Sequence, residues 1–133
     1  MDFRDELYLL AITVAMEAGG EPEAGQLAVA YVIVNRDGGV SDAIFKPWQF
    51  SAWNTDSPAR MNLDLVPDAT FRQCYRTAGA AYFGLLPDPS GGATHYLNEE
   101  ATKKARPTGD LPAWFDEAKV TARIGRHTFL RIV

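Results

Sequence analysis

The sequence predicts an α+β fold in which helices form the body and a small antiparallel sheet lies beside them. Two apolar stretches with helical spacing fill the first 36 residues, and a third covers residues 68–84. The last third carries short β-branched and aromatic segments separated by glycines. With 133 residues and no repeat or linker, the chain suits one domain, residues 1–133, around one hydrophobic core.

Two helices are expected before residue 37. Residues 3–18 combine large apolar and small side chains, and Gly19-Gly20 supply the stop. Pro22 suits the first turn of a second helix that runs to about Asn35. Its stretch YVIV could also form a strand, but thirteen residues without a turn signal favour the helix.

The rest of the chain alternates irregular, helical and extended segments. Residues 37–65 are punctuated by glycine and proline, so we expect loops there with one short helix near Ser41–Phe45. Residues 68–84 have the spacing of a third substantial helix. Short strands are expected in ATHYL, residues 93–97, and on both sides of Gly125, where they can pair as a small sheet.

Composition and charge narrow the classes of partner. The formal net charge is −4 with acids and bases interspersed, so the chain lacks the basic cluster that nucleic acid binding needs. Glycan recognition stays open because it depends on aromatic faces and hydrogen bonds. A monomer is assumed, since nothing in the sequence indicates an oligomer.

The N-terminus does not read as a targeting segment. Asp2, Asp5 and Glu6 precede the first apolar run, where a secretory signal carries positive charge. No apolar stretch is long enough for an integral membrane segment. We therefore expect synthesis in the cytoplasm, with export or lysis needed before the protein meets an external substrate.

Glu17 is the first candidate for chemistry. It falls at the C-terminal end of the first expected helix, where the helix dipole disfavours a second negative charge. Burial beside Met16 and repulsion from Glu21 are expected to raise its pKa further. A carboxyl group that is protonated near neutral pH can donate its proton to a departing sugar oxygen. The alternative is that Glu17 points to solvent at a fraying helix end.

Aromatic and polar residues alternate in the segment KPWQFSAWN. Trp48, Phe50 and Trp53 offer flat apolar faces next to the polar side chains of Gln49 and Ser51. That combination suits a sugar ring, which has apolar faces and hydroxyl groups around its edge. The same rings could instead fill the core.

A third group lies in GGATHYLN, on the first expected strand. Alternation along a strand places Tyr96 and Asn98 on one face and His95 on the other, and we favour the first pair as the one that faces a cleft. A zinc site built from His95 and His127 is disfavoured, because no HExxH or CxxC motif or third ligand accompanies them. No metal and no cofactor are expected.

Hydrolysis by a serine or cysteine nucleophile has weaker support in the sequence than acid catalysis by Glu17. No GxSxG motif occurs, and Ser90 lies in a turn without a nearby base. Cys74, the only cysteine, lies in an apolar helix with no sign of an activating environment, although a thiol pair with His95 or His127 stays open.

Taken together, these motifs resemble the SleB/CwlJ-type cell wall hydrolases, which include spore cortex-lytic enzymes and related phage lysins. The resemblance rests on five segments in the family's order: EAGGEP with GQ, AVAYVIVNR, WQFSAW, DPSGGATHYLN and IGRHTF. These segments cover nearly the whole chain.

The resemblance implies a lysozyme-like or lytic-transglycosylase-like fold and cleavage of the glycan strands of peptidoglycan. Carried over by position, the family's catalytic glutamate falls on Glu17, and Glu21 matches a second acid that serves either in catalysis or as a structural cap. His127 lies in the closing motif, where a structural duty is expected. The other matches lie along the groove or near the site: Gln49, Phe50, Ser51, His95, Tyr96 and Asn98.

Two departures from the family's pattern stand out. Gly19 occupies a position where many relatives carry an arginine, which is expected to loosen the loop after Glu17. The stretch MNLDLVPDATF matches the family only loosely, so the floor of the groove is not assigned.

The number of carboxyl groups separates the mechanisms. A two-carboxylate glycosidase needs a partner acid, for which Asp56, Asp64 and Asp88 are candidates by loop position only. A lytic transglycosylase needs only one acid, because the C6 hydroxyl of muramic acid attacks its own anomeric carbon. We therefore expect a lytic transglycosylase that uses Glu17 and that could serve as a phage endolysin. Hydrolysis of the muramidase or glucosaminidase type and a non-catalytic glycan-binding domain are the alternatives.

Overall fold

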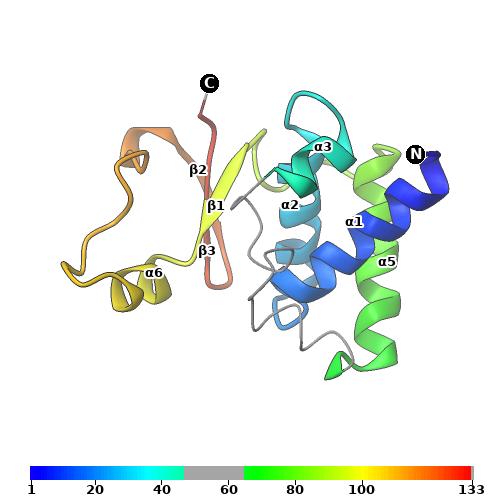
Figure 1. Ribbon diagram of the computed structural model, residues 1–133, viewed down its shortest axis with the longest axis horizontal. Coiled ribbons are helices and arrows are strands. Elements are labelled where there is room, and N and C mark those ends of the chain that lie inside the picture. The colour runs from blue at the N-terminus through cyan, green and yellow to red at the C-terminus, as the bar shows by residue number, and fades with distance from the viewer. Residues whose placement is uncertain (47–64, 133) are drawn as a thin grey trace.

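The computed structural model describes residues 1–46 and 65–132 and has the expected α+β fold. Helices form one half: α1 (Phe3–Ala18), α2 (Glu23–Val34), α3 (Val40–Phe45) and α5 (Asp68–Tyr82). The other half contains β1 (His95–Leu97), α6 (Glu99–Ala105), a 3-10 turn (Glu117–Lys119), β2 (Val120–Ile124) and β3 (His127–Leu130). Figure 1 shows the sheet between the helical body and α6.

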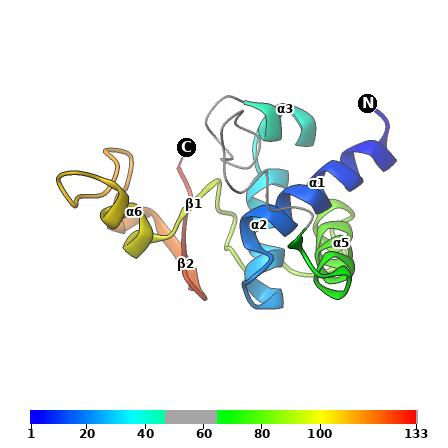
Figure 2. The ribbon, with the colours of Figure 1, turned by 60° about the horizontal axis from the view of Figure 1, so that its bottom comes forward.

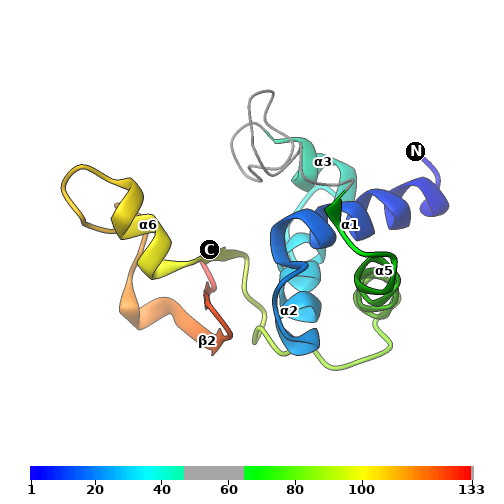
Figure 3. The same ribbon diagram turned by 90° about the horizontal axis from the view of Figure 1, so that it is seen from below.

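The core of the helical body surrounds α2. Every residue from Gly25 to Ile33 is buried, because α1, α3 and α5 all pack against this helix. α1 contributes Leu10, Val14 and Ala18, which recur every four residues and so lie on one face. Figures 2 and 3 show α5 on the side of the body away from the sheet. The described part of the chain contains no helix able to span a membrane.

The three strands are antiparallel in the order β1-β3-β2. Tyr96 pairs with Phe129, so their side chains share one face of the sheet. Phe129 is fully buried in the core cluster of the helical body. This face of the sheet therefore packs on the helices, and the opposite face carries α6, where the Thr128 hydroxyl donates a hydrogen bond to the Glu99 carboxylate.

The helices and strands expected from the sequence are confirmed, with small changes at their ends. Pro22 is the N-cap of α2 rather than its first residue, and α5 ends at Tyr82. α6 is not among the elements expected from the sequence, although Asn98 caps it by accepting from the amide of Ala101. Acids in its first turn and lysines in its last turn are the usual signals for such a helix.

Candidate active site

Glu17 and Tyr96 meet where the helical body faces the sheet. Glu17 is half-buried in the last turn of α1, whose C-terminal end points toward the sheet (Figure 1). Tyr96 reaches it from β1, and the phenol donates a hydrogen bond to the carboxylate. Burial and the negative charge of Glu17 raise the pKa of Tyr96 well above its ordinary value, and the positive charge of Arg36 opposes them only in part. Tyr96 is therefore a protonated donor near neutral pH.

The ring of Tyr96 is positioned by two rings of β3. His127 contacts it edge to face, with centroids 4.9 Å apart and planes at 71°. Phe129 lies 6.0 Å away, centroid to centroid. Because Phe129 is anchored in the core, the phenol is held in place from the sheet side.

Glu21 turns toward the β2–β3 hairpin. Its side chain is only 5% exposed, and it accepts hydrogen bonds from the backbone amide of Arg126 at 2.8 Å and from the guanidinium Nε of Arg126 at 3.1 Å. Burial acts to raise the pKa of Glu21, but these bonds and the charges of His127 and Arg126 hold it below its ordinary value. Glu21 is therefore an ionised link between the start of α2 and the hairpin.

Gly125 and His127 complete this link. Gly125 has a φ of 57°, and a side chain there would place its Cβ only 2.9 Å from the Glu21 Oε1 atom. The Nδ1 atom of His127 lies 3.4 Å from the same oxygen. Burial lowers the pKa of His127, and although Glu21 opposes this shift, the ring is neutral at neutral pH. The hairpin thus approaches Glu21 closely and carries the ring that supports Tyr96.

The turn after Glu17 is tight, not loose as expected from Gly19. The amide of Gly19 donates to the Ala15 carbonyl at 3.1 Å, and the amide of Glu21 donates to the Ala18 carbonyl at 3.0 Å. A Cβ on Gly19 would lie 2.5 Å from the Ala15 oxygen, so this backbone position has no room for a side chain. Glycine therefore permits the close turn that leads from Glu17 to Glu21.

The other strand residues have different surroundings. Asn98 uses its side-chain oxygen to cap α6. His95 lies on the opposite face of β1 from Tyr96, with its Nδ1 atom 2.9 Å from the Thr94 hydroxyl and its ring 5.3 Å from that of Trp114. Of the pair favoured from the sequence, the structure thus brings only Tyr96 to Glu17.

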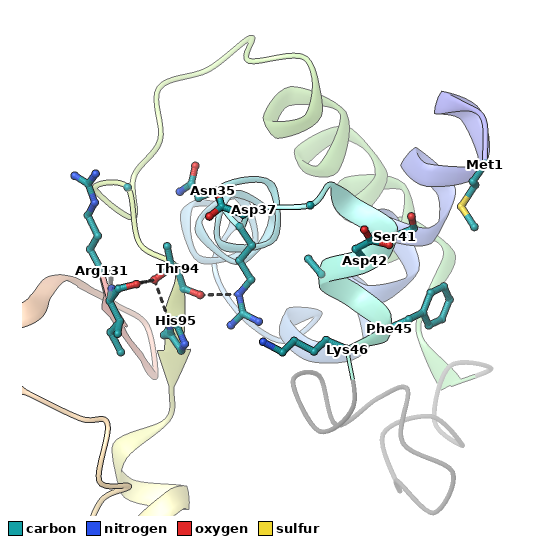
Figure 4. A pocket seen from close by; sticks show the side chains of 15 residues that line it. Met1, Asn35, Asp37, Ser41, Asp42, Phe45, Lys46, Thr94, His95 and Arg131 are labelled. Carbon is teal, nitrogen blue, oxygen red and sulfur yellow. Dashed lines mark hydrogen bonds between the residues drawn. The ribbon is translucent and has the colours of Figure 1, made fainter.

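An open cavity of about 1260 Å³ lies between the α2–α3 region and the start of β1, and Figure 4 shows its lining. Arg36, at the end of α2, donates from Nε to the Thr94 carbonyl at 2.7 Å. Burial lowers the pKa of Arg36, and Tyr96 opposes that shift. The charges of Arg36 and Lys46 also act, after burial, to lower the pKa of His95. The cavity therefore borders β1, the strand that carries Tyr96.

The metal and thiol alternatives gain no geometric support. His95 and His127 lie on opposite faces of the sheet, so they do not point toward one ion. Cys74 is fully buried in α5, and burial raises the pKa of its thiol to about 11. A thiol with that pKa is protonated and unreactive near neutral pH.

The predicted sugar-contacting loop lies outside the described residues. Trp48, Gln49, Phe50, Ser51 and Trp53 all belong to it, and their role stays a prediction. Two residues that the sequence reasoning did not assign to the site are Arg126, which binds Glu21, and Arg36, which faces the cavity. Both stand inside the quoted motifs IGRHTF and AVAYVIVNR, which is the only signal that could have singled them out.

This fold is found in a known class of protein. The pattern of the cell wall hydrolase family matches residues 20–130, and the chain belongs to that family. Because the matched range begins just after Glu17, the assignment of this residue depends on its own geometry.

Solved structures of the class show the same architecture. The catalytic domain of the germination-specific lytic transglycosylase SleB from Bacillus anthracis aligns with a TM-score of 0.68 at 29% identity, covering 98% of this chain and 97% of that one. The catalytic domain of the Bacillus cereus SleB protein aligns with a TM-score of 0.71 at 30% identity, covering 98% and 93%. The chain thus has the fold of the SleB catalytic domains, as the motifs implied.

Curated relatives are longer than this chain. A spore cortex-lytic enzyme from Halalkalibacterium halodurans is 34% identical over 131 residues, which cover 94% of this chain and 34% of the relative. One from Bacillus cereus is 31% identical over 135 residues, which cover 96% and 45%. The chain therefore spans between a third and a half of the length of these relatives.

Proposed function

We propose that this domain cleaves peptidoglycan between N-acetylmuramic acid and N-acetylglucosamine, as a lytic transglycosylase with Glu17 as its acid and base. The observation that carries the proposal is the Glu17–Tyr96 pair, in which a half-buried carboxyl group meets a phenol at the boundary between helices and sheet. Membership of the cell wall hydrolase family supports the substrate, and the likeness to a SleB lytic transglycosylase supports the reaction.

The proposed reaction needs one carboxyl group and no water. Glu17, as the acid, gives its proton to the oxygen between the two sugars, and the bond from that oxygen to C1 of muramic acid breaks. The C6 hydroxyl oxygen of the same muramic acid then bonds to C1 and returns its proton to the Glu17 carboxylate. The products are a free C4 hydroxyl on N-acetylglucosamine and a 1,6-anhydro ring on muramic acid, and the enzyme is restored.

Tyr96 supports the half of this cycle in which Glu17 is ionised. Because its raised pKa keeps the phenol protonated, Tyr96 can donate to the Glu17 carboxylate after the proton has left for the sugar. The same bond orients the carboxyl group. We therefore assign Tyr96 the positioning and stabilisation of ionised Glu17.

The other described candidates for a second acid are engaged in holding the structure. Both oxygens of Glu21 accept from Arg126. One oxygen of Asp88 accepts from the amide and hydroxyl of Ser90, and the other accepts from Asn35 at 2.9 Å and from the Gly92 amide at 3.1 Å. These contacts favour a reaction that uses Glu17 alone. The candidates Asp56 and Asp64 lie outside the described residues.

The setting of the reaction follows from its substrate. Peptidoglycan lies outside the cytoplasm, so we propose that the domain acts on the wall after export or after lysis of the cell that made it. Trp48 and Trp53 are proposed to support neighbouring sugars, as aromatic faces do in glycan grooves.

Mass spectrometry of the soluble fragments released from purified peptidoglycan tests the proposal. Wild-type protein is expected to release fragments that end in 1,6-anhydro-muramic acid, one water lighter than reducing ends, and Glu17→Gln is expected to release none. Reducing ends would indicate a hydrolase and a second acid in its mechanism. If neither protein released fragments, a glycan-binding domain without chemistry would take the place of this proposal.

A further inference from the structure

The cavity beside Tyr96 gathers positive charge in a chain that is acidic overall. Arg36, Lys46 and Arg131 line it, whereas the chain as a whole has a net charge of −4. Among the described residues, no carboxylate forms an ion pair with Lys46 or Arg131. Within the described part of the chain, no acidic side chain therefore neutralises these two cations.

Two of the positive charges lie on one flank of the cavity. Figure 4 shows Lys46 extending from the end of α3 toward His95 on β1, while Asp42 lies on the other flank. Arg36 is held on the same flank as Lys46 and His95 by its bond to the Thr94 carbonyl. Asp37 also lines the cavity, so the lining has three cationic side chains, besides the N-terminal residue Met1, against two carboxylates. An anion is favoured between Lys46 and β1, not beside α3.

This flank adjoins the proposed active site along β1. Arg36 bonds to the Thr94 carbonyl, His95 lines the cavity, and the next residue of the strand is Tyr96, the partner of Glu17. A glycan strand bound at Glu17 is therefore placed so that a group attached to it can enter the cavity. The sugars of peptidoglycan carry no charge, whereas the peptide stem attached to each muramic acid through its lactyl group carries carboxylates.

We infer that this cavity binds a carboxylate of the peptide stem, so that the domain prefers glycan strands that carry stems. The inference rests on the proposed function, because it takes peptidoglycan as the substrate. Lys46 supplies a flexible ammonium group, Arg36 a fixed charge, and Arg131 a further charge at the rim. Other cell wall anions, such as the phosphates of teichoic acids, share this chemistry, so the test separates the two sources.

Binding by the Glu17→Gln variant tests the inference without turnover. Isothermal titration calorimetry compares three soluble, teichoic acid-free strands: one with tetrapeptide stems, one with the stem carboxylates amidated, and one stripped of stems by an amidase. The first is expected to bind about tenfold more tightly than the other two, the effect of one charge-assisted contact. Equal dissociation constants for all three strands would overturn the inference, as would tight binding that appears only after teichoic acid is added to the stem-free strand.

Charge reversal identifies the residue responsible. Adding Lys46→Glu to the same background is expected to reduce the tenfold preference to about twofold or less, because attraction becomes repulsion. Lys103→Glu, on exposed α6 beyond the far face of the sheet, is the matched control and should keep the preference. An equal loss in both variants would contradict a local site. Stem-dependent binding by a wild-type protein that releases no fragments would support this inference and contradict the proposed cleavage.

Discussion

The helical body and the sheet with α6 are stabilised by different forces. In the body, α2 is buried along nearly its whole length and α1, α3 and α5 pack around it. Beside the sheet, α6 has no buried residue, and its connection to the strands is polar, through Glu99 to Thr128 and Arg123. The body gains its rigidity from apolar packing, whereas α6 is held to the sheet by individual hydrogen bonds and ion pairs.

The candidate active site lies between these halves and takes one residue from each. Glu17 comes from the body and Tyr96 from the sheet, and polar contacts that cross the boundary fix their relation. Arg36 donates to the Thr94 carbonyl at 2.7 Å, and Asn35 donates to the Ala93 carbonyl at 3.0 Å. Substitutions at the boundary should therefore separate effects on chemistry from effects on stability.

The largest effect is expected at Glu17, on the side of the rigid body. Glu17→Gln removes the only proposed acid, so kcat should fall about a thousandfold or more, while the free energy of unfolding changes by less than about 0.5 kcal/mol. Fragment release and thermal unfolding measured on the same preparation test both parts. Glu23→Gln, an exposed carboxylate in the first turn of α2, is the control for losing one charge. Near wild-type activity in a folded Glu17→Gln protein would contradict the assignment.

Tyr96→Phe tests the contribution of the sheet. The ring and its contacts with His127 and Phe129 are kept, but the hydrogen bond to Glu17 is lost, so kcat should fall about 10- to 100-fold with little change in KM. Steady-state kinetics on soluble glycan strands give the two constants separately. The control is Tyr75→Phe on the exposed side of α5, and a rise in KM alone would instead assign Tyr96 to substrate binding.

The helical body could be predicted from the sequence because its signals are local. Caps, glycine stops and apolar spacing lie within each helix, and they gave α1 with its observed ends, Phe3–Ala18. α6 also had local signals, but Asn98 was assigned to the cleft and its capping role was overlooked. The error came from treating a polar residue after a strand as part of the site.

The site was predictable only in part, because its contacts join distant segments. The position of Glu17 at a helix end followed from the pattern around it. Its pairing with Tyr96 depends on strand register, and the contact between Glu21 and Arg126 spans 105 positions. A local sequence pattern does not predict which distant segments will come into contact. The resemblance to a family identified the motifs but not how their side chains contact one another.

Glu21→Gln should weaken the connection between the halves. The substitution removes the negative charge that lies against Arg126 and His127, and the Glu21 side chain that carries it is only 5% exposed. The free energy of unfolding should therefore fall by about 2 kcal/mol at neutral pH. Chemical denaturation measures the loss, with Glu23→Gln as the exposed control. A loss no larger than in the control would mean that Glu21 does not hold the hairpin.

The same contact predicts how stability depends on pH. The pKa of Glu21 is lowered in the folded protein from its ordinary value of 4.5, so the unfolded chain binds the proton more readily. The contribution of Glu21 is therefore complete above about pH 4.5 and declines as pH falls through the folded pKa. The difference in stability between wild type and Glu21→Gln should shrink when denaturation is repeated below that pH. A difference that grows on acidification would contradict an ionised Glu21.

The smallest effect is expected at Glu99, where α6 meets the sheet. Its partner Arg123 is 49% exposed and also binds Glu117 at 2.7 Å, so solvent screens the charge and another acid shares it. Glu99→Gln keeps an acceptor for Thr128 and should lower the free energy of unfolding by less than about 1 kcal/mol. Hydrogen exchange can locate the change, because faster exchange confined to the amides of α6 would mean that this helix opens independently of the body. Glu100→Gln is the matched control, because the Glu100 carboxylate pairs with Lys104 four residues on within the same helix. If exchange instead accelerated throughout α2, the two halves would unfold as one unit. The claim that apolar packing holds the body and polar contacts hold α6 independently of each other would then be wrong.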